Sequence, residues 1–308
     1  MDIATQLQNL YQKFGEIPGI SIELHRELVA INVINDYAEA TVFLQGAQLS
    51  HYQRHGEAAL IWLSPKSDFQ QGTPLRGGIP ICWPWFGDLN KNPATITGCY
   101  KTEQTAHGLV RDKEWQLNHI NNLSDGRTHL NLQLVFNYTT HDEETLQATL
   151  SYDIYIGKTL ELILTVENNS NKPLNYSAAL HSYFAIADIH ETVVTGLENT
   201  PFIDCLNEWR TSSENTKLKI TGETDRIYQQ VNGAQQIIDS GNKRTITINS
   251  QNSNSCVLWN PWIEKSQRLS HFPDTGYKSM LCLETGNILD DSICLAPLGS
   301  HQLLLHIS

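Results

Sequence analysis

Several features that mark common protein classes are missing from this chain of 308 residues. The six cysteines are widely spaced and form no Cys-x-x-Cys, so they indicate neither a zinc ribbon nor a disulfide framework. The apolar runs are short pieces such as residues 60–63 and 303–305, far below the roughly 20 residues of a membrane-spanning helix. We therefore expect free, mostly buried thiols and no membrane partner.

Basic charge is also scarce. The chain has 33 acidic and 21 basic side chains, a formal net charge of −12, and no charged tail. This balance argues against a nucleic-acid partner. The N-terminus has Asp2 and alternating polar residues where a signal peptide needs a basic region followed by an apolar one, so we expect the protein in the cytoplasm.

Motifs for common cofactors are absent as well. There is no Walker loop, no Gly-x-Gly-x-x-Gly and no pair of histidines at metal-ligand spacing, so we expect neither a cofactor nor a metal. Hydrophobic residues make up 40% of the chain and charged residues 18%, which is ordinary for a globular protein with a real core.

Alternation of apolar and polar residues with a period of two predicts that most of the chain is β-structure. It is clearest at residues 130–138, 146–156 and 160–166, which the turn-prone segments 139–144 and 157–159 separate. Strands joined by such short segments pair as antiparallel hairpins. Further strands are expected at residues 28–34, 40–44, 245–249, 278–284 and 302–307.

One segment has helical periodicity. Within residues 4–14, Leu7, Leu10, Tyr11 and Phe14 recur on one face, which predicts an N-terminal helical appendage. No alternation of strands with helices and no long linker is present, so we expect a single β-sandwich domain over residues 1–308.

Residues 76–87 form the densest motif, Arg-Gly-Gly-Ile-Pro-Ile-Cys-Trp-Pro-Trp-Phe-Gly. Its glycines permit close backbone approach, its prolines restrict the chain, and its tryptophans offer flat faces that pack against sugar rings. The motif fits a rigid loop at a ligand site. It equally fits an aromatic corner of a sandwich, with Arg76 paired to a surface carboxylate.

Residues 106–115 carry a second polar motif. If this segment is extended, His107 and Arg111 lie on one face. The planar fork of arginine matches phosphate oxygens, so that face would suit a phosphate group. The alternative is that Arg111 pairs with Asp112 or Glu114 on the surface.

Two titratable residues stand in apolar, strand-like runs. Small neighbours leave space beside His181, and an ordinary histidine pKa of about 6.5 suits proton transfer. Alternation places Glu284 with Cys282 on the face opposite Leu281 and Leu283, where burial would raise the pKa of the carboxyl toward that of a general base. The alternatives are a structural histidine and a carboxylate exposed at a strand end.

A polar pair lies in residues 224–228, Thr-Asp-Arg-Ile-Tyr. Asp225 and Arg226 could bind hydroxyl groups of a ligand. An ion pair between them at a turn is the simpler interpretation.

Five segments together, in this order, resemble the hexose-6-phosphate mutarotases, the glucose-6-phosphate 1-epimerase branch of the aldose 1-epimerase superfamily. They are residues 76–87, 107–111, 180–184, 224–228 and 282–285. The resemblance implies an all-β fold, a large antiparallel β-sandwich of the galactose mutarotase type, with the sugar in a cleft across one sheet. It also implies interconversion of the α and β anomers of glucose 6-phosphate or a related aldohexose 6-phosphate, without a cofactor.

Carried over position by position, the resemblance makes His181 the general acid and Glu284 the general base. Five further residues would bind the substrate: Arg76, Arg111 and His107 at the 6-phosphate, Asp225 at a sugar hydroxyl, and Trp83 as a wall of the sugar site. The expected partner is thus a small hexose 6-phosphate, bound by a monomer.

The chain departs from the family pattern at two points. The segment from Asp88 to Thr105 is longer than the usual link, and Leu109-Val110 replaces the commoner Phe-Ala. Two alternatives stand beside the phosphate-specific enzyme. One is a noncatalytic carbohydrate-binding or sugar-phosphate-sensing module, and the other is a free-aldose mutarotase, in which Arg76 and Arg111 would not converge in the cleft.

Overall fold

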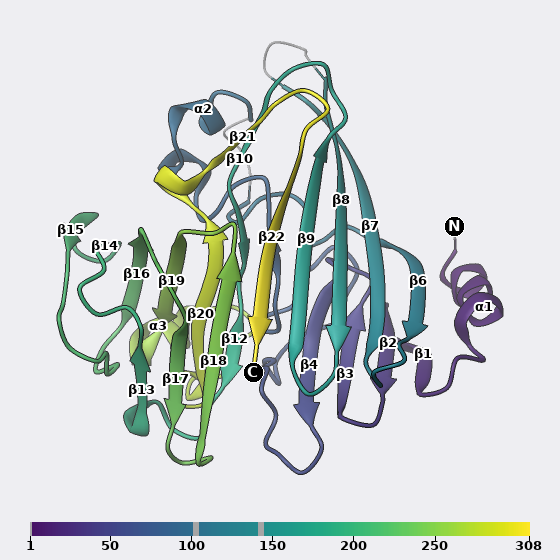
Figure 1. The fold of residues 1–308 in the computed structure, drawn as a ribbon, viewed down its shortest axis with the longest axis horizontal. Coiled ribbons are helices and arrows are strands. Elements are labelled where there is room, and N and C mark those ends of the chain that lie inside the picture. Colours follow the sequence, from purple (N-terminus) through teal and green to yellow (C-terminus); the bar gives the residue numbers. More distant parts are fainter. Residues whose placement is uncertain (1, 101–104, 141–144) are drawn as a thin grey trace.

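Antiparallel β-sheets make up most of the computed structural model, which describes residues 2–100, 105–140 and 145–308. One eight-stranded sheet lies in front in Figure 1. Its strands, in spatial order, are β13 (Thr192–Thr195), β17 (Gln235–Asp239), β18 (Arg244–Gln251), β22 (Ser300–Ile307), β9 (Leu160–Asn168), β8 (Thr145–Ile156), β7 (Thr128–Thr139) and β6 (Gln116–Asn122).

Three of these strands confirm the clearest prediction from periodicity. β7, β8 and β9 are consecutive antiparallel neighbours, as the alternation and the short turns between them indicated. Part of the predicted turn at 139–144 lies outside the described residues. Along β8, every second side chain from Leu146 to Ile156 is buried, because one face of the sheet covers the core.

The second layer holds another eight-stranded sheet and a four-stranded one. The larger contains β15 (Arg210–Ser212), β14 (Phe202–Asp204), β16 (Thr224–Gln229), β19 (Ser255–Asn260), β20 (Met280–Asn287), β11 (Ala178–Leu180) and β5 (Ile81–Cys82), with β12 (Tyr183–Ala185) also on β20. The smaller contains β1 (Ile20–His25), β2 (Leu28–Ile34), β3 (Ala38–Phe43) and β4 (Gln48–Arg54). A two-stranded sheet pairs β10 (Leu174–Tyr176) with β21 (Ile293–Leu295).

The main core lies between these layers. It joins Leu150 and Leu162 of the front sheet to Leu281 and Leu283 of β20 and to Ile31 of the four-stranded sheet. In Figure 1 the four-stranded sheet lies behind the right-hand strands of the front sheet. This face-to-face packing is that of a β-sandwich, as predicted.

Helices are few and peripheral. They are α1 (Ile3–Phe14), α2 (Ala94–Thr97) and α3 (Trp262–Arg268), with short 3-10 turns η1 (Leu89–Lys91), η2 (Ile189–Glu191), η3 (Gly276–Lys278) and η4 (Leu289–Asp291). None of the helices in the described part of the chain has the length and apolar character to cross a membrane.

The N-terminal helix was predicted correctly. Asp2 caps it by accepting a hydrogen bond from the amide of Thr5, and Phe14 is buried at its other end. The prediction for Tyr11 was wrong, because this side chain is about half exposed while Leu7 and Leu10 pack against the core.

Strand β20 determines where the functional side chains lie. All eight of its residues are buried, because the sheet is covered on both faces. Leu281 and Leu283 point into the main core, whereas Met280 and Cys282 belong to a second apolar cluster on the other face. The alternation predicted for this strand is therefore confirmed, and Glu284 follows on the face of the second cluster.

Candidate active site

Strand register brings His181 opposite Glu284. β11 pairs Leu180 with Thr285, and β12 pairs Tyr183 with Cys282. The same antiparallel register between these pairs places His181 across from Glu284, on one face of the sheet. The Nδ1 atom of His181 lies 3.3 Å from Oε1 of Glu284, and the backbone amide of His181 donates to the carbonyl of Pro80. Two residues 103 positions apart in the sequence thus meet in one site.

Neighbouring strands extend this site in cross-strand rows. β19 pairs Val257 with Glu284, and β16 pairs Ile227 with Val257. Another row runs through Asp225, Trp259, Cys282 and Tyr183 on the same face. Directly paired residues share a face of a sheet. The register of four strands therefore brings acidic, aromatic and imidazole groups together.

A cavity of about 270 Å³ lies over this face. Its apolar walls include Phe86, Trp209 and Trp259. Its polar lining includes Arg76, His107, His181, Asp225, Lys265 and Glu284. A pocket that is mostly apolar with a few convergent polar groups is the usual form of a small-molecule site.

Burial acts on both members of the central pair. His181 is 7% exposed and Glu284 is 1% exposed. Burial lowers the pKa of His181 to about 3, and the positive charges of Arg111 and Arg76 add to this effect. Burial, with the charge of Asp225, raises the pKa of Glu284 well above its ordinary value. Both groups are therefore held toward their neutral forms.

Glu284 also has an unused oxygen. Its Oε2 atom is buried and has no hydrogen-bond partner among the described residues, and the same is true of Nδ1 of His181. Buried polar atoms are nearly always hydrogen-bonded, so unsatisfied ones facing a cavity are sites where a ligand supplies the partner. The two alternatives raised from the sequence, an exposed carboxylate and a satisfied structural histidine, do not match these surroundings.

Arg76 and Arg111 converge on a neighbouring hollow. A second cavity of about 320 Å³ is lined by both arginines and shares Arg76, His107 and His181 with the first. Neither guanidinium has a carboxylate partner among the described residues. One nitrogen of Arg111 donates to the carbonyl of Ala106, and its buried Nε has no partner. Two uncompensated guanidinium groups favour an anion.

The carboxylates near Arg111 have other partners. Asp112 pairs with Lys113 at 3.4 Å, and Glu114 accepts a hydrogen bond from Gln6 at 2.5 Å. The surface pairing of Arg111 considered from the sequence is therefore wrong.

His107 reaches the cavities by a turn. The extended conformation assumed for its segment is wrong, because His107 and Gly108 have φ angles of 66° and 80°. A Cβ on Gly108 would lie 2.0 Å from the carbonyl oxygen of Trp83, so the close approach of these two segments requires glycine. The amide of Gly87 donates to Nδ1 of His107, which leaves Nε2 as the protonated nitrogen of the neutral ring.

The imidazole of His107 is neutral for the same reason as that of His181. Burial lowers its pKa well below the ordinary value, and the charge of Arg111 adds to this. A neutral ring with its proton on Nε2 is a hydrogen-bond donor toward an anion.

Asp225 lines the first cavity from β16. Its Oδ2 atom lies 3.8 Å from Nζ of Lys265, and burial raises the pKa of its carboxyl despite that positive charge. Arg226 pairs instead with Glu214 at 3.1 Å, because adjacent residues of a strand point to opposite faces. The Asp225–Arg226 ion pair considered from the sequence is therefore wrong.

Trp83 does not line the cavity, contrary to the prediction. Alternation puts Cys82 on the cavity side and turns Trp83 into the main core, where it packs against Phe136 with ring centroids 4.7 Å apart. The aromatic walls missed from the sequence are Trp209 and Trp259. Trp259 follows Val257 by two on β19 and could have been found from alternation, but Trp209 lies in a loop without periodicity.

Metal-ligating atoms also come together at this site. His181, Cys282 and Glu284 offer ligand atoms within 4.8 Å of one another. Burial raises the pKa of the Cys282 thiol well above its ordinary value, so a metal ion here would have to displace the proton of the thiol. The protonated surroundings suit proton transfer to and from a ligand.

The fold is of the galactose mutarotase type, a large antiparallel β-sandwich, and here an imidazole and a carboxyl face one cavity. Comparison with known proteins agrees. Residues 30–308 match the aldose 1-epimerase family. The chain belongs to that family, and it is an isomerase.

Named relatives cover most of the chain. A protein of Escherichia coli K12 is 33% identical over 274 residues, 87% of this chain and 86% of the relative, and is named "Putative glucose-6-phosphate 1-epimerase". A protein of the same name from Haemophilus influenzae is 35% identical over 231 residues, 74% of this chain and 73% of the relative. A crystal structure from Salmonella typhimurium, titled as a putative mutarotase, superposes with a TM-score of 0.84 at 30% identity, covering 95% of this chain and 94% of that one. These findings support a mutarotase-type function.

Proposed function

We propose that the protein interconverts the α and β anomers of an aldohexose 6-phosphate, with glucose 6-phosphate as the reference substrate. The observation that carries the proposal is the buried His181–Glu284 pair in a cavity that Arg76 also lines, beside a second cavity lined by Arg76 and Arg111. Neither arginine has a carboxylate partner in the described chain. The names of the bacterial relatives agree with this substrate.

The reaction needs two proton transfers, one at each of the two oxygens bonded to C1. A base removes the proton from the hydroxyl on C1 while an acid protonates the ring oxygen, and the ring opens to the aldehyde. Rotation about the C1–C2 bond and closure with reversed roles give the other anomer. The hydroxyl oxygen and the ring oxygen are both bonded to C1, so the adjacent side chains of His181 and Glu284 can serve the two oxygens of one bound sugar. Glu284 serves as the base and His181 as the acid.

The resting pair already holds the proton that this reaction needs. A neutral imidazole beside a neutral carboxyl contains the same number of protons as an imidazolium beside a carboxylate. Moving one proton from Glu284 to His181 therefore creates the base and the acid together, without exchange with water.

The substrate's phosphate promotes that transfer. Burial lowers the pKa of His181 most, and the charges of Arg111 and Arg76 lower it further. A bound phosphate offsets those charges. The imidazolium then forms more readily. Phosphate binding thus positions the sugar and also increases the fraction of His181 that carries the proton to be delivered.

Anomer exchange followed by NMR tests the proposal. With the wild-type protein, we expect exchange of glucose 6-phosphate to be accelerated strongly and that of free glucose weakly. Equal acceleration of both sugars would identify a free-aldose mutarotase. Binding of the sugar phosphate without accelerated exchange would identify a noncatalytic binding module and overturn the proposal.

A further inference from the structure

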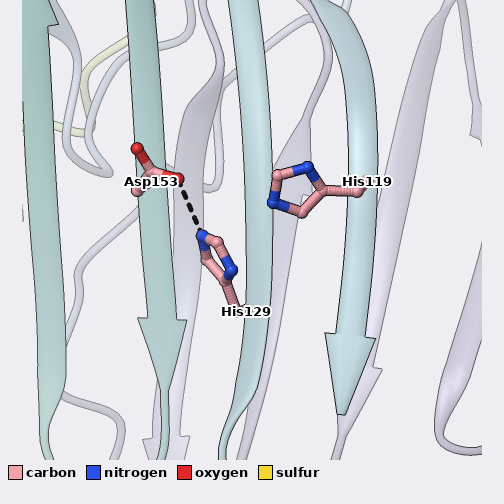
Figure 2. A group of neighbouring side chains, drawn as sticks. All are labelled: His119, His129 and Asp153. Atoms are coloured by element: carbon pink, nitrogen blue, oxygen red, sulfur yellow. Dashed lines mark hydrogen bonds and ion pairs between the residues drawn. The ribbon is translucent and has the colours of Figure 1, made fainter. Parts of the chain in front are cut away.

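A second group of imidazole and carboxylate side chains lies on the outer face of the front sheet. His119 comes from β6, His129 from β7 and Asp153 from β8, and Figure 2 shows the three side chains gathered across these adjacent strands. Their ligand atoms all lie within 4.8 Å of one another. The alternate residues Leu130 and Ile154 point into the main core, so the group lies on the opposite face from it.

A β-bulge is what turns His119 toward this group. β6 and β7 pair Leu117 with Leu132 and then His119 with Asn131, so Asn118 is an extra residue. In a regular strand, residues 117 and 119 share a face, so without the bulge His119 would point into the core with Leu117. Bulges commonly redirect a single side chain at sheet edges. Here the bulge places an imidazole beside another imidazole and a carboxylate.

Neighbouring side chains hold the other two members in place. Nδ2 of Asn131 donates to Oδ1 of Asp153 at 2.8 Å, and Oδ1 of Asn131 accepts from Nδ2 of the bulge residue Asn118 at 3.0 Å. The ring of His129 stacks on Tyr155 with centroids 4.2 Å apart and an interplanar angle of 3°. Such outer contacts are what orient the ligands in metal sites.

A hydrogen bond between His129 and Asp153 would explain the positions of these two residues but not that of His119. Nε2 of His129 lies 2.7 Å from Oδ1 of Asp153, which accounts for two residues. His119 is the third: its ring centroid is 4.9 Å from that of His129, and it has no hydrogen bond in the described part of the chain. An ion shared by all three would use that free imidazole.

We propose that His119, His129 and Asp153 bind a divalent transition-metal ion of the Zn²⁺ type. Two imidazoles and one carboxylate supply three ligands, and water completes a tetrahedron. Because ligand atoms lie about 2.0–2.2 Å from zinc, small side-chain rotations close the site. The ion replaces the proton between His129 and Asp153, and that proton moves to Nδ1 or to water.

Metal binding would stabilise the pairing of the edge strand β6 with the rest of the front sheet. β6 is the last strand of the front sheet, and its other edge has no strand neighbour among the described residues. Edge strands open most easily. Lys13 of α1 donates a hydrogen bond to the backbone carbonyl of Asn118 in the bulge. Its positive charge repels a bound metal ion, whereas the negative charge of Asp153 attracts the ion.

The experiment titrates metal-free protein with Zn²⁺ by calorimetry. We compare wild type with His119→Asn and Asp153→Asn. His51→Asn is the matched control, because His51 lies 3.4 Å from Glu39 on the other layer without a third ligand. Loss of an outer contact of a metal site costs about 10- to 100-fold in affinity, and we expect loss of a ligand to weaken zinc binding at least about 100-fold, with the control unchanged.

Cobalt distinguishes this site from the cavity. Co²⁺ held by imidazole and carboxylate gives only weak visible bands, whereas Co²⁺ at His181, Cys282 and Glu284 adds an intense thiolate charge-transfer band in the near ultraviolet. We expect the weak bands, their loss in His119→Asn, and zinc-dependent slowing of amide exchange in β6. Wild-type affinity in both variants, or a thiolate band as the only signal, would overturn the proposal.

Discussion

Two imidazole–carboxylate pairs in this protein have opposite surroundings. The His181–Glu284 pair is buried at 3.3 Å, and the second carboxylate oxygen has no partner among the described residues. The His129–Asp153 pair is only partly buried at 2.7 Å, and Asn131 also donates to the carboxylate. Both pairs join an imidazole to a carboxyl group, and their surroundings differ.

Those surroundings determine the charge of each pair. At Glu284, burial raises the pKa and no hydrogen bond compensates. At Asp153, burial also raises the pKa, but hydrogen bonds from His129 and Asn131 outweigh it and keep the carboxyl below its ordinary value. A neutral pair can exchange a proton with a substrate, whereas an ionised carboxylate suits a cation. Hydrogen bonds, more than residue type, separate the two.

The largest expected effect is on catalysis at the buried pair. Glu284→Gln keeps the shape of the side chain but removes the base, and we expect a fall in the rate of glucose 6-phosphate anomer exchange of about 10²- to 10⁴-fold. Glu39→Gln is the matched control, because Glu39 forms a partly exposed pair with His51 away from the cavity. NMR exchange rates measure both. Normal turnover in a folded Glu284→Gln variant would show that this carboxyl is not the base.

The next effect concerns the arginines that act on His181. A hydrogen bond to a charged group is worth about 1.5–3 kcal/mol, so Arg111→Leu should lower kcat/KM for glucose 6-phosphate about 10- to 150-fold. The value for free glucose should change much less. Equal losses for both sugars would contradict a phosphate role.

Added inorganic phosphate tests separately whether an anion at the arginines affects His181. It should accelerate anomer exchange of free glucose by the wild type, because it offsets the charges of Arg76 and Arg111 near His181. The acceleration should vanish in Arg111→Leu. The same acceleration in both proteins would mean that phosphate acts elsewhere.

A stability measurement probes the neutral state of Glu284. Because its pKa is raised in the folded protein, the unfolded chain releases this proton first as pH rises above 4.5. Stability from the protonated carboxyl is therefore complete below that pH and is lost above it. Relative to wild type, the free energy of unfolding of Glu284→Gln should rise with pH by about 1.4 kcal/mol per unit, from pH 4.5 up to the pKa of Glu284 in the folded protein. Urea unfolding from pH 5 to 8 measures this, and a constant difference would contradict a raised pKa.

The alternation of apolar and polar residues predicted the long strands of the sandwich, but it did not predict the short strands that hold the active site. The long strands β7, β8 and β9 repeat their pattern several times, so the sequence identifies them. Strands β5, β11 and β12 have two or three residues each, too few for a period to appear. Yet these short strands hold His181 opposite Glu284. The family motifs supplied the pairing that periodicity alone could not.

Two kinds of information were beyond the sequence pattern. The turn at His107 depends on positive φ angles and on the approach of Gly108 to Trp83, which is a tertiary contact. The surroundings of Asp225 depend on Lys265, from a helix 40 residues away in the chain. The error at Trp83 was different, because alternation from Cys82 would have assigned it to the core.

The smallest expected effect separates the core tryptophan from the cavity tryptophan. Trp259 lines the cavity, and an aromatic contact with a ligand is worth about 0.5–1.5 kcal/mol. Trp259→Phe should therefore raise KM about 2- to 10-fold. Its loss of stability should be smaller than that of Trp83→Phe, because Trp259 keeps one side on the cavity whereas Trp83 is fully enclosed. Trp83→Phe instead leaves space in the main core, and it should lower the free energy of unfolding by about 1–3 kcal/mol while leaving KM near that of wild type. Steady-state kinetics measures KM and urea unfolding measures stability for both variants. A raised KM in Trp83→Phe with unchanged stability would show that Trp83 does line the sugar site.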